Sequence, residues 1–306
     1  MKTKDFPYLS FPFAEFNPPQ AEAIKFATQD CNLIVALGTA VGKTAVSLCF
    51  FGHELSTQTD TKCMYASPLR AISEERSAQF RSITEWKDVP TVINTGDHSA
   101  TPEMFADARL VIVTTETLDS KARNPKTHGS WLEKVGVLVI DELHMLDEPS
   151  RGPALESGLI NFTSVNKKAR LVGLSATMSN ADEIAKWFKL LNGKETYVVA
   201  SEWRPVKLNV HLVGVGKDLP ESETSRTAID LVQKHSGDKI LVFVHTKKLG
   251  RRLVEELRSS GIRQTEFYHA GLTRQQRALI EDMFKNPTSG LNVLVTTSAL
   301  AMGVNL

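Results

Sequence analysis

The chain has 306 residues, of which 42% are hydrophobic and 23% are charged, and its formal net charge at pH 7 is +1. This composition is that of a globular protein with a substantial core, and the length predicts two domains. The near-neutral charge excludes binding of nucleic acid through overall charge alone, so any polyanion would have to be held by local groups.

Hydropathy and cysteine spacing indicate the cellular compartment of the protein. No run of about 18 apolar residues exists, which excludes a hydrophobic transmembrane helix. The N-terminal sequence MKTKDFPYLS lacks the apolar centre of a signal peptide. Cys31, Cys49 and Cys63 have neither paired nor zinc-like spacing, so we expect reduced thiols in the core. We therefore expect a cytoplasmic protein, or one of the nucleoid or nucleus, that is not secreted and has no membrane partner.

The first predicted helix follows a Phe/Pro-rich segment and starts within PPQAEAIKFATQ, where Pro18 and Pro19 suit a helix N-terminus. Gln20 would lie in the first turn of this helix. An exposed amide at this position could read the edge of an adenine base, because it offers one donor and one acceptor. The alternative is a solvated glutamine at a helix start, which the residue type alone favours.

The stretch NLIVALGTAVGKTAVSLCFFGHEL, residues 32–55, reads as a strand, a small-residue loop and a helix. This context is the one that a phosphate-binding loop requires. Gly42 lets the backbone approach a phosphate oxygen, and the helix N-terminus directs partial positive charge at it. Lys43 would neutralise the β- and γ-phosphates of a nucleotide, and the Thr44 hydroxyl would ligate Mg²⁺. The common form GxxxxGK[ST] has its first glycine where Leu37 stands here, and the alternative is a helix start that binds nothing.

Short apolar runs of strand length follow, with helix-like stretches between most of them. They are residues 63–66, 91–94, 110–113, 135–140 and 170–174. Strands that alternate with helices predict a parallel sheet covered by helices on both faces. Ligands of such sheets bind beyond the carboxyl ends of the strands, so the polar residues that end these runs are candidates. They are SPLR (67–70), TGD (95–97), TTE (114–116), DELH (141–144) and SAT (175–177).

DELH is the strongest of these strand ends, because two carboxylates follow the buried run VGVLVI. Asp141 would hold Mg²⁺, usually through water, and Glu142 would orient and deprotonate an attacking water. His144 could link this site to neighbouring strand ends. The alternative is an acidic helix N-cap after a strand. The phosphate-loop motif about 100 residues earlier favours a nucleotide hydrolase.

The pattern restarts near residue 200. SEWRPV, residues 201–206, contains an Arg-Pro step that should interrupt regular structure, so we expect a linker between domain 1 (residues 1–200) and domain 2 (residues 207–306). The second domain reads as strand, helix, strand, helix, strand, so we expect a smaller and unfinished α/β unit. The predicted elements are a strand at 239–245, a helix through Leu249, Leu253 and Leu257, a strand ending in YHAGL (268–272), a helix at 274–285 and a strand at 292–297.

Taken together, these motifs resemble those of the DExH-box helicases of superfamily 2, in particular the group of archaeal DNA-repair helicases and Ski-like RNA helicases. The matching segments are PPQAEAI, GTAVGKT (with Ala40 tolerated), SPLRAI, TGD, TTE, DELH, RGPALE (151–156), LSATMSNADEIAKWF, SEWRPVKL, FVHTKK, YHAGLTRQQR and TTSALAMGVNL. Thr296 and Ala299 depart mildly from the last motif, usually ATxTLAxGVNLP.

The resemblance implies an α/β fold of two RecA-like parallel-sheet domains, the second incomplete, that bind ATP and Mg²⁺. It implies catalytic roles for Lys43, Asp141, Glu142 and His144, and Mg²⁺ ligation by Thr44 and Asp141. Nucleotide binding would fall to Gln20, Thr39, Ala40, Val41, Gly42, Lys43, Thr44, Gly303 and Asn305. Nucleic-acid binding would fall to Pro68, Arg70, Thr95, Gly96, Thr115, Glu116, His245, Thr246 and Thr297. Ser175 and Thr177 would couple ATP hydrolysis to movement of the nucleic acid.

The resemblance further implies an ATP-dependent helicase motor that moves 3′ to 5′ on single-stranded or forked DNA. We favour DNA because PLRAI and WRPVKL resemble the archaeal repair members most. An RNA helicase of the same group is one alternative, and a nucleotide-gated binding module without turnover is another. The family's final motif, QxxGRAGR, does not occur before the chain ends at Leu306. We therefore expect a fragment or half of a split enzyme, with impaired turnover unless a partner or a missing part supplies the arginine finger.

Overall fold

The computed structural model describes residues 1–306 except 69, 96–97, 215–220, 298–299 and 301–306. The chain divides into two compact units, Met1–Leu208 and Asn209–Leu306. This division falls two residues after the end of the expected linker, 201–206. Three predicted site residues, Gly96, Gly303 and Asn305, lie outside the described residues.

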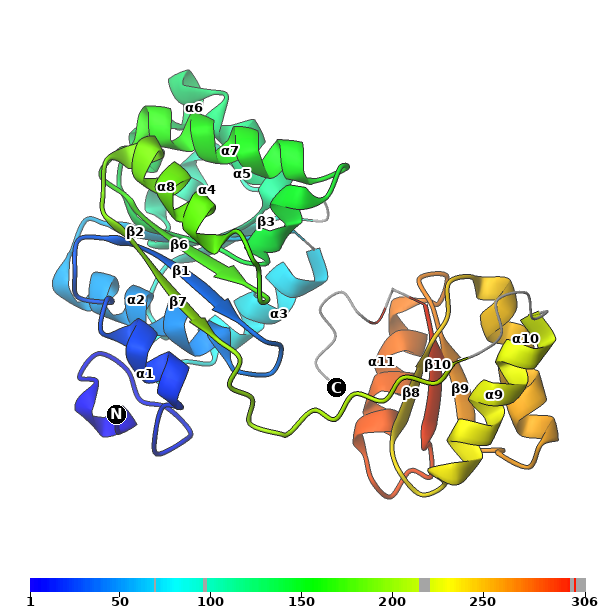
Figure 1. The fold of residues 1–306 in the computed structure, drawn as a ribbon. Coiled ribbons are helices and arrows are strands. Elements are labelled where there is room, and N and C mark those ends of the chain that lie inside the picture. The colour runs from blue at the N-terminus through cyan, green and yellow to red at the C-terminus, as the bar shows by residue number, and fades with distance from the viewer. Residues whose placement is uncertain (69, 96–97, 215–220, 298–299, 301–306) are drawn as a thin grey trace. The chain divides into compact units, whose positions relative to one another are not determined.

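A parallel sheet of seven described strands forms the centre of the first unit (Figure 1), in the order β3-β4-β2-β5-β6-β1-β7. The strands are β1 (Asn32–Leu37), β2 (Lys62–Ser67), β3 (Thr91–Asn94), β4 (Leu110–Thr114), β5 (Val135–Ile140), β6 (Arg170–Ser175) and β7 (Thr196–Ser201). The first six agree with the strands predicted from the sequence to within one residue at each end. β7 was not predicted.

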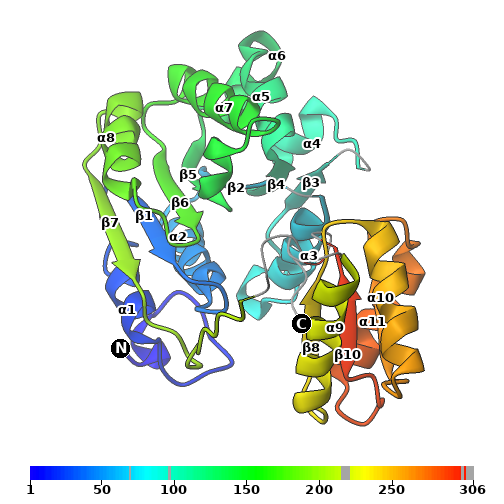
Figure 2. The same cartoon turned by 45° about the vertical axis from the view of Figure 1, so that its right-hand side comes forward.

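Helices cover both faces of this sheet, as Figures 1 and 2 show. Alternate residues of β1 divide between two cores, because successive side chains of a strand point to opposite faces. Leu33 and Val35 pack with α1, α2 and α3, whereas Ile34 and Ala36 pack with the helices α4 to α8. The helices are α1 (Pro18–Ile24), α2 (Lys43–Thr57), α3 (Arg70–Arg81), α4 (Pro102–Asp107), α5 (Thr115–Ala122), α6 (Pro125–Leu132), α7 (Gly152–Val165) and α8 (Ala181–Asn192).

The second unit repeats this plan with a smaller parallel sheet, in the order β8-β10-β9. Val293 and Val295 of β10 pack with α9 and α10, while Leu294 packs with α11 on the other face. The elements are α9 (Glu221–Lys234), β8 (Ile240–Phe243), α10 (Lys247–Ser259), β9 (Thr265–Tyr268), α11 (Arg274–Lys285) and β10 (Val293–Thr296). The two units are therefore α/β domains with parallel sheets, the fold class predicted from the sequence.

Two predictions about the chain as a whole can be compared with this fold. Cys31, Cys49 and Cys63 are buried and free, as expected of reduced thiols in the core. Over the part of the chain that the structure describes, no helix is long and apolar enough to cross a membrane.

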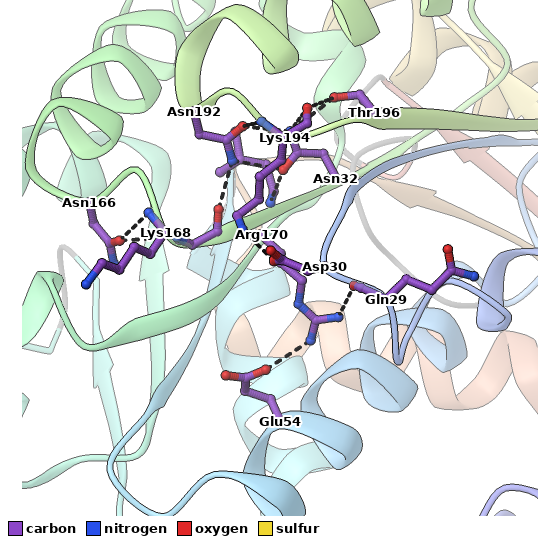
Figure 3. A network of polar contacts seen from close by, with 12 residues as sticks. Gln29, Asp30, Asn32, Glu54, Asn166, Lys168, Arg170, Asn192, Lys194 and Thr196 are labelled. Carbon is purple, nitrogen blue, oxygen red and sulfur yellow. Dashed lines mark hydrogen bonds and ion pairs between the residues drawn. The ribbon is translucent and has the colours of Figure 1, made fainter.

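A buried ion pair joins α2 to the start of β6 at the amino edge of the first sheet (Figure 3). Arg170 Nη2 lies 3.0 Å from Glu54 Oε2, and the two side chains are only 6% and 11% exposed. Arg170 Nη1 donates to the carbonyls of Ala27 (2.7 Å) and Gln29 (2.9 Å). Because these hydrogen bonds join a residue of β6 to the carbonyls of Ala27 and Gln29, Arg170 fixes the segment before β1 against β6.

A reciprocal amide pair lies beside this ion pair (Figure 3). Asn32 and Asn192 each donate an Nδ2 proton to the other's Oδ1 at 2.9 Å. Asn32 Oδ1 also accepts the Leu171 N–H at 2.9 Å. Buried amides with this many partners fix one geometry, because each broken bond would leave a buried polar group unsatisfied. The amino ends of β1 and β6 are therefore locked side by side.

Replacing Glu54 by alanine should strongly destabilise the first unit, because Arg170 would remain buried without its charged partner. We expect a loss of about 3 kcal/mol in the free energy of unfolding. Urea denaturation followed by tryptophan fluorescence measures it for the first unit alone, since the chain's 4 tryptophans all precede residue 209. The control is Asp60→Ala, which breaks the exposed pair with Lys134 and should cost less than about 1 kcal/mol. Equal losses in the two variants would contradict this account of the network.

Candidate active site

The loop between β1 and α2 has the backbone of a phosphate-binding loop. Gly42, the N-cap of α2, has φ = 80°, and Ala40 has φ = 63°. Left-handed residues in short loops are typical of the nests of N–H groups that bind anions. A left-handed alanine is strained, and such strain concentrates at functional sites.

Lys43 opens α2 and folds back over this loop. Its Nζ donates to the carbonyls of Leu37 (3.0 Å) and Gly38 (3.2 Å). Burial lowers the pKa of Lys43, and the nearby carboxylates of Glu142 and Asp141 act in the opposite direction. Both hydrogen-bond partners of the ammonium are neutral carbonyls. A polyphosphate would replace them with charged acceptors, which bind an ammonium more strongly.

Gln20 does not have the exposed amide that the sequence suggested. The residue is 6% exposed, its Oε1 accepts the Asn17 N–H at 3.1 Å, and its Nε2 donates to the carbonyls of Val41 (3.1 Å) and Gly42 (2.9 Å). The expectation of a solvent-exposed glutamine was therefore wrong. The amide is used in a capping box at the start of α1 and in bracing the phosphate loop.

Asp141 follows β5 and is held on both of its oxygens. Oδ1 accepts the Glu142 N–H at 3.0 Å, and Oδ2 accepts a hydrogen bond from the Tyr65 hydroxyl of β2. Burial raises the pKa of Tyr65 well above its usual value, Asp141 adds to this rise, and Arg76 of α3 opposes it. Tyr65 is therefore a fixed donor. Because it lies within an apolar strand, the sequence indicated only a core residue.

Glu142 and His144 extend the site toward β6. Glu142 adopts φ = 52°, so the two described non-glycine residues with positive φ, Ala40 and Glu142, both lie at this site. Burial raises the pKa of Glu142, and the neighbouring Asp141 raises it further. His144 Nδ1 lies 3.5 Å from Glu142 Oε2 and accepts the Ala176 N–H at 3.5 Å. His144 thus joins the ends of β5 and β6, the position that the sequence suggested.

A second group of predicted residues follows β2, β3 and β4. Arg70 is exposed at the start of α3, and Glu116 is exposed in the first turn of α5. Pro68 is buried, and its carbonyl accepts a hydrogen bond from Arg151 Nη1 at 3.2 Å. Arg151 opens the RGPALE segment, so that segment holds Pro68 at the end of β2.

Three hydroxyl residues of the predicted site are buried in the structure. They are Thr95 (4% exposed), Thr115 (1%) and Ser175 (0%). Among the described residues, Thr95 Oγ1 and Ser175 Oγ have no hydrogen-bond partner. Buried polar atoms without partners are rare and call for a physical reason, such as a role in a second conformation. Thr177, by contrast, is exposed beyond the end of β6.

The strand order divides the candidates into two adjacent groups. Apart from Gln20, which precedes β1, the first unit's residues predicted to bind or hydrolyse the nucleotide follow β1 and β5, and the predicted coupling residues follow β6, which lies between these two strands. Those predicted to bind nucleic acid follow β3, β4 and β2. The registers pair Ser67 with Thr114, Ile140 with Gly173, and Ala36 with Ser175. The strands therefore end close to the same level, and the two groups share one edge of the sheet.

The predicted residues of the second unit lie at the ends of its strands. His245 and Thr246 are exposed after β8, but the Thr246 hydroxyl accepts the Leu249 N–H at 3.1 Å and caps α10. The Thr297 N–H donates to the Tyr268 carbonyl at 3.3 Å. Thr246 therefore has a structural role that the sequence analysis did not consider.

Comparison with protein families identifies both units. Residues 17–184 match the DEAD/DEAH box helicase family, and residues 223–306 match the helicase conserved C-terminal domain. Similar curated proteins include the ATP-dependent DNA helicase Hel308 of Thermococcus kodakarensis, 33% identical over 94% of this chain and 28% of that protein. Hel308 of Methanocella arvoryzae is 30% identical over 99% of this chain and 46% of that protein. The chain thus spans less than half the length of these relatives.

Solved structures support the fold. The DUF1998 helicase MrfA, solved bound to DNA and AMPPNP, matches with a TM-score of 0.76 and 18% identity over 96% of this chain and 43% of that chain. The Mycobacterium smegmatis helicase Lhr, solved bound to ssDNA and AMP-PNP, matches with a TM-score of 0.68 and 23% identity over 96% of this chain and 41% of that chain. The predicted pair of RecA-like domains is therefore confirmed.

Replacing Tyr65 by phenylalanine should lower the affinity of the site for Mg²⁺, because Asp141 would lose the donor that orients it. We expect the Mg²⁺ concentration for half-maximal binding of a fluorescent ATP analogue to rise about ten-fold or more. Binding without Mg²⁺ should stay unchanged. The matched control is Tyr268→Phe, which removes another buried tyrosine–carboxylate bond, to Glu281 at 2.6 Å in the second unit. A Mg²⁺ midpoint equal to that of the unsubstituted chain would remove Tyr65 from this role.

Proposed function

Because the chain belongs to the DEAD/DEAH box helicase family, we propose that it is the ATP-driven motor of a helicase that moves along single-stranded DNA. The observation that carries this proposal is the division of one sheet edge between two groups of residues. A site with phosphate-binding chemistry follows β1 and β5, whereas the exposed cation Arg70 follows β2, and the predicted hydroxyl residues Thr95 and Thr115 follow β3 and β4.

The residues after β1 and β5 fit a nucleotide with Mg²⁺. Magnesium prefers oxygen ligands and is usually bound by one or two carboxylates together with substrate phosphates. Asp141 supplies one carboxylate and Thr44 one hydroxyl, and no cluster of three acidic or metal-binding side chains occurs among the described residues. The metal would neutralise charge on the phosphates. A site with this few protein ligands therefore suits Mg²⁺ that arrives with ATP.

Glu142 is the candidate base for hydrolysis. Burial and the charge of Asp141 raise its pKa, which makes its carboxylate a stronger proton acceptor than an exposed glutamate. His144 lies beside it and contacts the end of β6, where Ser175 and Thr177 stand. We assign Glu142 the activation of water and Lys43 the binding of the β- and γ-phosphates.

The residues after β2, β3 and β4 would contact the backbone of the strand. Contacts to phosphates position a DNA strand without reading its base sequence. They need few cationic side chains when backbone amides and hydroxyl groups also bind the phosphates. A net charge of +1 agrees with such local binding. DNA is favoured because the curated relatives are DNA helicases and the solved neighbours are bound to DNA. Movement from 3′ to 5′ is proposed on the family resemblance.

Replacing Lys43 by alanine should abolish binding of ATP and leave the first unit folded. In the part of the chain that the structure describes, the ammonium donates to two loop carbonyls and forms no ion pair, so we expect its loss to remove phosphate binding and leave the fold intact. Titration with a fluorescent ATP analogue measures affinity, and tryptophan fluorescence in urea checks the fold. Lys189→Ala, on the exposed side of α8, is the control and should bind normally. A Lys43→Ala variant with unchanged affinity would refute the phosphate-loop assignment.

Replacing Arg70 by alanine should weaken binding of single-stranded DNA whatever its sequence. The slope of log affinity against log salt should fall by about 1, as expected for one lost phosphate contact. Fluorescence anisotropy with labelled oligonucleotides at several salt concentrations gives both values. Arg81→Ala, at the other end of the same helix, is the matched control. Unchanged affinity would exclude Arg70 from the interface, and tighter binding of RNA than of matched DNA would favour the RNA alternative.

A further inference from the structure

Arg204 lies directly over the start of the phosphate loop. A Cβ atom placed on Gly38 would come within 3.3 Å of Arg204 Cζ and 3.4 Å of its Nη1 and Nη2. On the same residue, the Gly38 carbonyl accepts a hydrogen bond from Lys43 Nζ at 3.2 Å. Two cationic side chains therefore meet at Gly38, and a side chain at this position would crowd the guanidinium.

The sheet explains why a residue so distant in sequence reaches the loop. β7 pairs with β1 in parallel, and Ser201 lies opposite Leu37 at the ends of both strands. The chain that leaves β7 therefore passes beside the loop that leaves β1. Ser201 Oγ accepts the Trp203 N–H at 3.1 Å, and Trp203 packs against the core on that side. Pro205 restricts the backbone of Arg204 further.

A pocket of about 590 Å³ opens at this place within the first unit. Its volume is in the range of small-molecule sites. The residues around it are Gly38, Thr177, Glu202, Arg204, Lys207 and Leu208. The pocket thus joins the phosphate loop, the end of β6 and the segment after β7. Glu202 lines the same pocket, but Arg204 forms no ion pair with it or with any other described residue. The Arg204 guanidinium therefore lies near Gly38 of the loop without a bound carboxylate.

We propose that Arg204 binds the terminal phosphate of ATP, opposite Lys43. This inference rests on the proposed function. The lysine of a phosphate loop reaches the β- and γ-phosphates, so its position at Gly38 places the terminal phosphate near that residue. A guanidinium presents a planar fork of donors that matches phosphate oxygens. ADP lacks the phosphate concerned, so Arg204 distinguishes the two nucleotides.

The contact between Arg204 and the terminal phosphate would also hold the segment that follows β7 against the phosphate loop. Arg204 stands three residues after β7 and four before the end of the first unit at Leu208. When it is held by the terminal phosphate, the following segment is tethered to the loop. When that phosphate is absent, the tether is lost. The segment after β7 therefore responds to the identity of the bound nucleotide.

Nucleotide affinity tests the binding part of this inference. Arg204→Ala should bind the non-hydrolysable analogue AMP-PNP about ten-fold or more weakly, the effect of losing a charge-assisted hydrogen bond. Its affinity for ADP should stay within about two-fold, because ADP makes no such bond. Arg204→Lys should recover part of the loss, since it restores the charge without the fork. The control Arg123→Ala removes another exposed arginine of the first unit and should change neither affinity.

Limited digestion with trypsin tests the tether without any turnover. The bond between Lys207 and Leu208 is exposed and cleavable, whereas the Arg204–Pro205 bond resists trypsin, so the substitution removes no cleavage site. AMP-PNP should slow cleavage after Lys207 relative to ADP, and Arg204→Ala should abolish this difference. If Arg204→Ala prefers AMP-PNP over ADP as strongly as the unsubstituted chain does, the inference about Arg204 is wrong and the proposed function still stands. Failure of the unsubstituted chain to bind either nucleotide would overturn the proposed function as well.

Discussion

The first unit depends on one constraint, which is that every strand of its sheet runs in the same direction. In a parallel sheet all carboxyl ends fall at one edge, so residues that lie about 100 positions apart in sequence meet there. At the opposite edge, the buried pair of Arg170 and Glu54 and the amides of Asn32 and Asn192 lock the starts of β1 and β6. Fixing where these strands begin also fixes where their ends, and hence the site residues, stand.

The same sheet explains how the carboxylates are held. β2 lies beside β5, so the Tyr65 hydroxyl reaches Asp141 across one strand spacing and remains a donor because burial suppresses its ionisation. The helix that follows β2, α3, presents Arg70 at its exposed start and Arg76 beside Tyr65. β2 and α3 thus contribute both to the residues proposed to bind DNA and to the site around Asp141.

Much of this arrangement follows from local sequence. The six predicted strands are continuous apolar runs that end in polar residues. Such runs are typical of parallel sheets, because both faces of the sheet are buried and successive residues must therefore be apolar. β7 was missed because it is an edge strand with a half-exposed pattern, and Tyr197 in it is 44% exposed. Gln20 was misjudged because a capping box and two loop carbonyls compete with solvent for its amide.

The remaining features depend on contacts that no local pattern reports. Tyr65 and Asp141 are 76 residues apart, and Tyr65 reads as an ordinary core residue of a strand. Arg204 reaches Gly38 only because β7 adds to the sheet next to β1, a pairing that the sequence did not predict. Thr246 caps a helix although its motif predicts contact with a ligand, since a hydroxyl can serve either purpose.

A crystal structure of the chain with AMP-PNP and Mg²⁺ would test the central claim most directly. The account predicts that Lys43 Nζ leaves the carbonyls of Leu37 and Gly38 for the phosphates. It also predicts that the metal lies beside Thr44 and Asp141, with the terminal phosphate between Lys43 and Arg204. An analogue bound elsewhere, or bound while Lys43 keeps both carbonyl contacts, would contradict the assignment of this edge of the sheet to ATP.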